Sequence, residues 1–225
     1  MATTTSQTLS EENYLKAIYR LEKQRNGKVS ATAIAEELDN NPASVVDMLK
    51  RLKEKKLIQY DKAKGAVLTG SGQKAAVLIV RKHRLWEVFL HDKLGYSWDE
   101  VHDIAEQLEH IRGYDLPDRL DKFLGFPKYD PHGDPIPQSN GIVPASESKP
   151  LSDVDLNSKV EVTSVSDSSA DFLKYLEKQG IRLHQVIMIK ERHDFDNSVL
   201  IELRGKKEVY LSYEAAKKVF VSKDK

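Results

Sequence analysis

A proline-rich stretch between residues 126 and 150 sets the strongest limit on how this chain folds. Of the eight prolines in the 225-residue sequence, six lie there, among turn-forming glycine, serine and asparagine residues. Because proline lacks a backbone N–H and breaks helix interiors, no long helix crosses this stretch. Apolar residues recur with helical spacing before it and with strand-like spacing after it. The sequence therefore predicts a mainly α protein with a small β domain, whose parts are joined by an extended, partly disordered stretch.

The amino-acid composition excludes several kinds of functional site. The chain contains no cysteine, which excludes disulfides, zinc–thiolate and iron–sulfur sites and fits a reducing compartment. Lys+Arg and Asp+Glu both number 35, so any affinity for nucleic acid depends on a local basic cluster. Residues 1–7 lack the basic and apolar regions of a signal peptide, and no apolar run is long enough to span a bilayer. We expect a cytoplasmic protein without a membrane partner.

The first 70 residues have the pattern of a winged helix-turn-helix. Amphipathic helices are expected over 10–25, from residue 30, and from residue 42 to about 55. Asn41 is the expected N-cap of the third helix, with Pro42 at its first position. Two short β segments follow, and Gly65 lies in the turn between them. Three helices and a hairpin are typical of a winged helix-turn-helix, so we predict residues 1–70 as a DNA-binding domain.

The third predicted helix and its neighbours carry side chains suited to DNA. Serine and asparagine hydrogen-bond to base edges, aspartate accepts from cytosine N4, and alanine contacts the thymine methyl group. Lysine and arginine suit phosphates. The predicted DNA-binding residues are Asn40, Asn41, Ala43, Ser44, Asp47, Lys50, Arg51, Lys62 and Lys64. The alternative is a solvated charged face on an ordinary helix hairpin.

Metal-capable side chains are concentrated in the second helical region. His102, Glu106, Glu109 and His110 lie at offsets 0, 4, 7 and 8. At roughly 100° per residue they fall at about 0°, 40°, −20° and 80° around one predicted helix, which reaches residue 111. All four therefore share one face. Imidazole and carboxylate ligands together suit Mn²⁺ and Fe²⁺, and Zn²⁺ also tolerates them.

The preceding helix, expected over 69–94, adds His83 and Glu87 one turn apart. A short turn through Gly95 makes the two helices pack antiparallel, so both groups of side chains could meet at a metal. A surface helix with scattered Glu and His is the alternative. The His-Glu-x-x-His motif of zinc peptidases is absent from the sequence, and no nucleophile triad or phosphate-binding glycine loop stands out. We therefore do not expect an enzyme.

The C-terminal part has the size of an SH3-like domain. Strands are expected over 159–166, 186–190, 198–203 and 208–211, with a helix over 171–179. The predicted domains are 1–70, 71–141 and 156–225, with a linker at 142–155.

Together these pieces resemble the diphtheria toxin repressor family of metal-dependent transcriptional regulators. The resemblance is carried by the segments YLKAIY (14–19), RKHRL (81–85), VHD (101–103), EH (109–110) and PHGDPIP (131–137), in the family's order. It implies a winged helix-turn-helix, a helical metal-binding and dimerisation domain, and an SH3-like, FeoA-type β-barrel. It also implies a homodimeric repressor that senses Mn²⁺ or Fe²⁺, binds a palindromic DNA operator and controls metal-uptake genes.

The resemblance further implies two neighbouring metal positions. The ancillary position matches His83, Glu87 and His102, with Asp171 as a candidate from the SH3-like domain. The primary position matches Glu106, Glu109 and His110, completed from the first helix by Asn13.

Two departures from the family pattern bear on the choice of metal. Iron-type members usually carry Cys at the position of Glu106 and Met at that of Asn13, whereas manganese-type members carry Glu and Asp. Glu106 thus favours manganese. Asn13 offers only a neutral amide oxygen, and Lys16 stands where a manganese-type member can have a carboxylate, so the choice between Mn²⁺ and Fe²⁺ stays open. Two other functions also stay open, a metalloenzyme that uses the His/Glu cluster and a metal-independent DNA-binding protein.

Overall fold

The computed structural model describes residues 7–25, 27–113, 115–145 and 147–223. Most of the N-terminal segment considered above as a leader lies outside these ranges. The chain forms two compact units. The N-terminal unit comprises Met1–His83, Gln107–Asp118 and Pro137–Val143, and the C-terminal unit comprises Arg84–Glu106, Arg119–Ile136 and Pro144–Lys225. No helix of the described part is both long and apolar enough to cross a bilayer.

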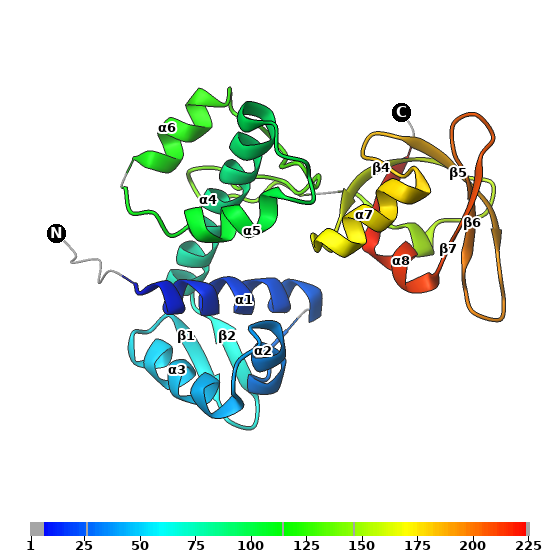
Figure 1. Cartoon of the computed structure of the whole chain (residues 1–225). Coiled ribbons are helices and arrows are strands. Elements are labelled where there is room, and N and C mark those ends of the chain that lie inside the picture. Colours follow the sequence, from blue (N-terminus) through cyan, green and yellow to red (C-terminus); the bar gives the residue numbers. More distant parts are fainter. Residues whose placement is uncertain (1–6, 26, 114, 146, 224–225) are drawn as a thin grey trace. The chain divides into compact units, whose positions relative to one another are not determined.

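The N-terminal unit contains the three helices and the hairpin predicted from the sequence (Figure 1). Apolar side chains at helical spacing, among them Leu15 and Ile18 of the first helix and Leu49 and Leu52 of the third, are fully buried in one core. Burial of this amphipathic face gives these short helices most of their stability. The elements are α1 (Leu9–Arg25), α2 (Ala31–Glu37), α3 (Pro42–Glu54), β1 (Ile58–Asp61) and β2 (Gly65–Leu68).

Local sequence signals fix the boundaries of these elements. The side chain of Asn41 accepts a hydrogen bond from the Ala43 N–H at 2.8 Å, and Pro42 opens α3, as predicted. The antiparallel hairpin pairs Ile58 with Leu68 and closes at Gly65, whose φ is +87°.

Three further helices follow the hairpin, namely α4 (Gly70–Leu94), α5 (Val101–Leu108) and α6 (Leu116–Phe123). The prediction that the metal-motif helix reaches residue 111 is wrong, because α5 ends at Leu108 and Glu109 and His110 lie in the turn that follows. Glu109 is fully buried in that turn. Helical periodicity contains no information about the tertiary contacts that hold it there, so the sequence alone placed both residues on the helix face.

The β domain of the C-terminal unit has the predicted SH3-like fold. Its six described strands form one antiparallel sheet in the order β3-β8-β4-β5-β6-β7, which is open rather than a closed barrel. Buried valine, leucine and isoleucine residues from the strands and from α7 form its core. Sequence reasoning missed α8 and β8, and also β3 and η1, which lie within the predicted linker at 142–155. The elements are β3 (Lys149–Pro150), a 3₁₀ helix η1 (Leu151–Asp153), β4 (Lys159–Val165), α7 (Ala170–Gln179), β5 (Val186–Arg192), β6 (Val199–Glu202), β7 (Glu208–Leu211), α8 (Tyr213–Lys218) and β8 (Val219–Lys223).

Residues 128–136 fold into a compact turn, contrary to the prediction of an extended, partly disordered stretch. Asp130 Oδ1 accepts hydrogen bonds from the backbone N–H groups of His132 (2.8 Å) and Asp134 (3.0 Å). Arg84 of α4 donates to Asp134 and to the Pro135 carbonyl, both at 2.6 Å. Proline excludes a helix here, but the aspartate hydrogen bonds order the segment.

Candidate metal and DNA-binding sites

Glu109 is the centre of a buried polar cluster in the N-terminal unit. Its Oε2 atom lies 2.6 Å from Lys16 Nζ and 2.6 Å from His83 Nδ1. Its Oε1 atom and the Oδ1 atom of Asn13 are buried without a hydrogen-bond partner. An unsatisfied buried acceptor costs roughly 1–3 kcal/mol, so each of these two oxygens is suited to ligate a cation.

His110 extends this cluster. Its Nδ1 atom lies 2.6 Å from Glu12 Oε2, and its Nε2 atom lies 3.7 Å from Glu109 Oε1. When Nδ1–H donates to the Glu12 carboxylate, the Nε2 lone pair is left for a metal, which is the usual arrangement of a ligating histidine. Sequence reasoning missed Glu12. Its only signal was its place directly before Asn13 on the same predicted helix.

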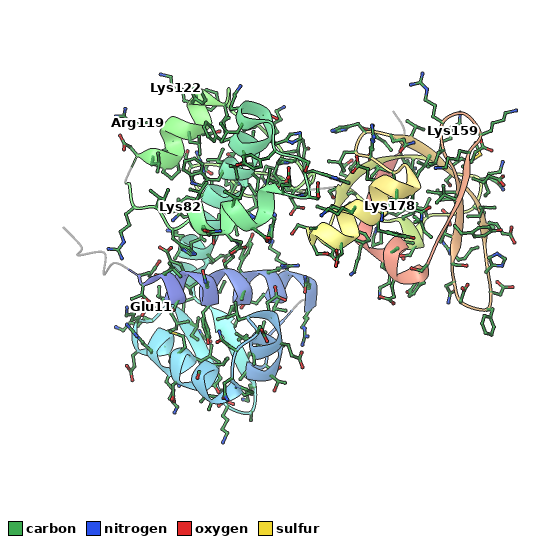
Figure 2. All side chains as sticks on the ribbon, viewed as in Figure 1. Glu11, Lys82, Arg119, Lys122, Lys159 and Lys178 are labelled. Atoms are coloured by element: carbon green, nitrogen blue, oxygen red, sulfur yellow. The ribbon has the colours of Figure 1, made fainter. Side chains whose placement is uncertain are left out.

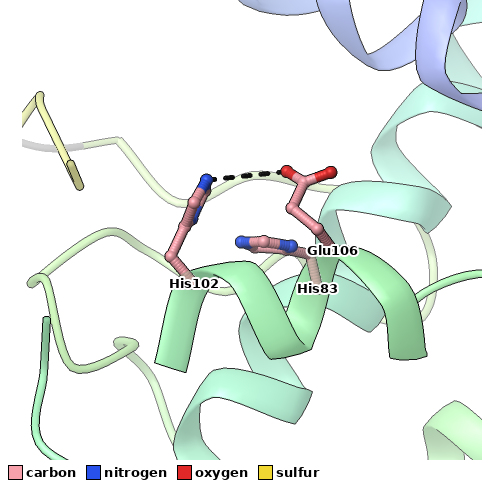
Figure 3. Close-up of side chains that lie close together, drawn as sticks. All are labelled: His83, His102 and Glu106. Carbon is pink, nitrogen blue, oxygen red and sulfur yellow. Dashed lines mark ion pairs between the residues drawn. The ribbon is translucent and has the colours of Figure 1, made fainter. Parts of the chain in front are cut away.

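A second polar cluster lies in the C-terminal unit around Glu87. The carboxylates of Glu87 and Asp130 and the imidazole of His132 offer ligand atoms that all lie within 4.8 Å of one another, and all three residues are buried. Glu87 Oε1 lies 3.3 Å from His102 Nδ1 and 3.4 Å from His132 Nδ1. His102 Nε2 in turn lies 3.6 Å from Glu106 Oε1, a pair that Figure 3 shows as a dashed line.

The electrostatics of this second cluster favour a bound cation. Burial raises the pKa of Asp130, and the negative charges of Glu87 and Asp134 raise it further. Burial alone would lower the pKa of His132, but its hydrogen bond to Glu87 and the charges of Glu87 and Asp130 outweigh burial and raise this pKa to about 9. Without a metal, the His132 proton therefore balances the buried carboxylates. A divalent ion would replace that proton.

Asp130 and His132 are candidate ligands that the sequence prediction did not include. They belong to the segment PHGDPIP and the residue before it, which carried the family resemblance but was interpreted as linker. Asp171, predicted as a candidate ligand, is exposed in the first turn of α7. From the segment that precedes α7, Ser168 Oγ lies 3.2 Å from His102 Nδ1.

The predicted metal residues therefore divide between the two units. His83, Glu109 and His110 belong to the first cluster. Asn13, with its buried Oδ1, lies in the same unit. Glu87, His102 and Glu106 belong to the second. Figure 3 also labels His83, which lies on α4 one turn before Glu87.

The predicted DNA-binding side chains on α3, in the turn before it and on the hairpin are all exposed. Asp47 pairs with Lys50 at 3.0 Å. Asp61 accepts hydrogen bonds from two backbone N–H groups of the hairpin tip, both at 2.9 Å, and so orders the tip that carries Lys62 and Lys64.

Arg51 is held by the first helix. Its Nε lies 2.9 Å from Oε1 of Glu11, and Lys55 Nζ lies 2.7 Å from the same oxygen. Glu11 lies near the N-terminal end of α1 and is fully buried (Figure 2). Burial alone would raise the pKa of Glu11, but hydrogen bonds from Lys55 and Thr8 and the two nearby positive charges lower it below its ordinary value. Helix α3 is thus ion-paired to α1.

Known family models match along the chain in three consecutive segments. Residues 7–66 match the N-terminal DNA binding domain of the iron dependent repressors. Residues 69–138 match the metal binding and dimerisation domain of the same repressors. Residues 149–223 match the FeoA domain.

Relatives that span most of this chain decide the family. The diphtheria toxin repressor of Corynebacterium jeikeium is 30% identical over 184 residues, which are 80% of this chain and 76% of that protein. This chain belongs to the diphtheria toxin repressor family. The iron-dependent repressor IdeR of Mycobacterium tuberculosis is 37% identical over 126 residues, 56% of this chain and 54% of that protein. A solved structure of a manganese-dependent transcriptional repressor in complex with manganese is 36% identical, covers 95% of this chain and 100% of its own, and has a TM-score of 0.88.

Membership confirms the resemblance inferred from the sequence. The diphtheria toxin repressor family consists of metal-dependent transcriptional regulators, and this chain carries its DNA-binding, metal-binding and FeoA domains in the same order.

Proposed function

We propose that this member of the diphtheria toxin repressor family is a homodimeric repressor that binds a palindromic operator when loaded with Mn²⁺ or Fe²⁺ and controls metal-uptake genes. The observation that carries this proposal is a pair of unsatisfied buried oxygens, Asn13 Oδ1 on α1 and Glu109 Oε1 in the turn after α5. Helix α1 is also ion-paired to α3. The relatives include an iron-dependent and a manganese-dependent repressor. The carboxylate-rich donor set favours the harder Mn²⁺.

The ligands that we propose fall into two positions. At the first, the proposed donors are Glu109 and His110, which lie in contact, and Asn13 of the same unit. The resemblance adds Glu106. At the second, Glu87 and His102 are joined by Asp130 and His132, and the resemblance adds His83. Asp171 stays a candidate for this position by the same resemblance. A bound divalent ion would replace the positive charges of Lys16 and of the His132 proton beside these buried carboxylates.

The first helix connects the first metal position to DNA. Its Glu12 holds His110, and its Asn13 carries a buried oxygen without a partner. Its Glu11 holds Arg51 of α3 and Lys55 at the C-cap of that helix. A change in the position of α1 therefore reaches the recognition helix through side chains only one or two residues apart. By linkage, metal strengthens DNA binding to the extent that it favours the DNA-binding conformer.

The exposed face of α3 suits the major groove. We propose that Asn40, Asn41, Ala43, Ser44 and Asp47 contact base edges there. Lys50, Arg51, Lys62 and Lys64 would contact phosphates. A twofold dimer would present two such helices to half-sites separated by one helical turn or a multiple of it.

Operator binding tests this proposal directly. A DNA duplex would first be selected from random sequence with the Mn²⁺-loaded protein. Fluorescence anisotropy should then show tight binding with Mn²⁺ or with Fe²⁺ under anaerobic conditions, and at least about tenfold weaker binding with chelator, which is the usual size of an allosteric coupling. Equal affinity in all three conditions would rule out the metal switch and favour a metal-independent DNA-binding protein. Metal-dependent turnover of a substrate without DNA binding would favour a metalloenzyme.

His132 provides a prediction for the second metal position. His132→Ala should weaken metal binding there by about tenfold or more, because it removes a donor to the metal. Isothermal titration with Mn²⁺ should show the loss of one class of sites. His184→Ala, which removes an exposed histidine from the same unit, is the matched control and should titrate as the wild type does. An unchanged titration of His132→Ala would exclude His132 as a ligand.

A further inference from the structure

Lys16 places a positive charge inside the proposed first metal position. Its Nζ atom lies 2.6 Å from Glu109 Oε2 and 3.1 Å from His83 Nδ1, and the lysine side chain is only 19% exposed. Glu109 is fully buried, so the lysine balances a carboxylate that solvent does not reach. Asn13, on the same helix, leaves its buried Oδ1 without a partner.

Lys16 Nζ, Glu109 Oε2 and His83 Nδ1 cannot all form hydrogen bonds with one another. Lys16 Nζ only donates, and an ionised Glu109 Oε2 only accepts. His83 Nδ1 lies 2.6 Å from that oxygen, which requires a proton on Nδ1 for a hydrogen bond. It also lies 3.1 Å from Lys16 Nζ, which requires a lone pair on Nδ1. Whichever tautomer forms, one of the two contacts of His83 lacks its hydrogen.

The Lys16 ammonium therefore satisfies the acceptors around it only in part. Glu109 Oε2 and His83 Nδ1 both lie within hydrogen-bond distance of the ammonium, while Glu109 Oε1 stays unsatisfied. A single positive charge on a hydrogen-bond donor meets fewer of these acceptors than a divalent ion can. The lysine stem is long and flexible. Glu12 lies one turn earlier on α1, in the i,i+4 relation that favours a Glu–Lys pair, and offers the displaced ammonium another partner.

We propose that the Lys16 ammonium is a resident cation of the Glu109 position. It neutralises Glu109 in the metal-free protein and must leave the carboxylate when a divalent ion binds. Lys16 thereby lowers the affinity of this position for metal and sets the metal concentration at which the protein responds. The inference rests on the proposed metal-binding function and assigns Lys16 a role as a determinant of affinity rather than as a ligand.

Removal of this charge gives the test. Mn²⁺ affinity would be measured by isothermal titration for the wild type, Lys16→Met and Lys16→Arg. Lys23→Met serves as the matched control, because Lys23 is an exposed lysine on the same helix. We expect Lys16→Met to bind Mn²⁺ about tenfold more tightly than the wild type, since a like charge within 4–6 Å opposes a cation. Lys16→Arg keeps the charge and Lys23→Met removes a distant one, so both should stay within about twofold of the wild type.

Thermal unfolding of the metal-free protein adds a readout that does not depend on DNA. Lys16→Met should unfold at a lower temperature than the wild type without metal, because Glu109 loses its counter-charge, and should gain more from saturating Mn²⁺. Unchanged or weaker Mn²⁺ binding by Lys16→Met would overturn the inference, as would an equal increase in affinity for Lys16→Arg. If Lys16→Met does not fold, Lys16→Gln takes its place, because its amide is neutral and polar.

The two proposals can fail separately. If the variants show the expected order of Mn²⁺ affinity but DNA affinity does not depend on metal, the proposed role of Lys16 is supported and the repressor mechanism fails. If DNA binding depends on Mn²⁺ but Lys16→Met binds Mn²⁺ as the wild type does, the switch stands and the role of Lys16 fails.

Discussion

Replacement of His110 by alanine is expected to abolish the metal response of operator binding while the chain stays folded. The imidazole is held through Nδ1 by Glu12, so its Nε2 atom is the donor available to the Glu109 position. Loss of a ligand together with its supporting contact should weaken Mn²⁺ binding at this position by at least about 100-fold, at the upper end of what supporting contacts alone contribute. Operator affinity with Mn²⁺ should then equal operator affinity with chelator.

The matched control for this change is His91→Ala. His91 is an exposed histidine near the end of α4, and its Nδ1 lies 2.8 Å from the Tyr96 carbonyl oxygen. We expect its metal response to match that of the wild type in the same anisotropy titration. Circular dichroism would verify that both variants are folded. A His110→Ala protein that still responds to Mn²⁺ like the wild type would remove this histidine from the site.

Replacement of Gly72 by alanine is expected to destabilise the DNA-binding part of the chain by roughly 3 kcal/mol or more, the upper range for steric overpacking. A Cβ on Gly72 would lie 1.9 Å from the Leu57 carbonyl oxygen and 2.9 Å from its carbon. That oxygen already accepts hydrogen bonds from the backbone N–H and the hydroxyl of Thr69, both at 3.0 Å. The carbonyl therefore cannot move without breaking the contacts that start α4.

Gly70→Ala isolates the steric effect, because it makes the same chemical change two residues earlier in the same helix and its Cβ would meet no atom within 4 Å. Helix propensity alone favours alanine at both positions. Chemical denaturation should show a large loss of unfolding free energy for Gly72→Ala and little change for Gly70→Ala. Equal stability of the two variants would mean that the helix start relaxes around the new methyl group.

The features that could be predicted from the sequence depend on nearby residues. Asn41 and Pro42 are local signals for the start of α3, and the structure shows the predicted cap. The His83–Glu87 pair likewise needs only helical spacing to be recognised as metal-capable. Beside these local signals, the order of five short segments was enough to indicate the family.

The features that could not be predicted depend on residues far apart in the chain. Lys16 meets Glu109 across 93 residues, a contact that no periodicity encodes. Glu109 lies beyond the end of α5, where the pattern predicted more helix. Asp130 and His132 were overlooked because their prolines indicate irregular backbone, and irregular backbone can be either disordered or tightly fixed. The hydrogen bonds of Asp130 that decide between these outcomes appear only in the folded chain.

The compact turn at 128–136 also sets a condition on any shortened version of this protein. Val165 of β4 donates its backbone N–H to the His132 carbonyl at 3.0 Å, and a Cβ on Gly133 would lie 1.9 Å from the Thr163 carbonyl oxygen. The SH3-like domain thus provides the surface on which the compact turn at 128–136 packs. A chain cut after the turn would keep every proposed ligand except Asp171 and still lose the surface that shapes one of its two metal positions.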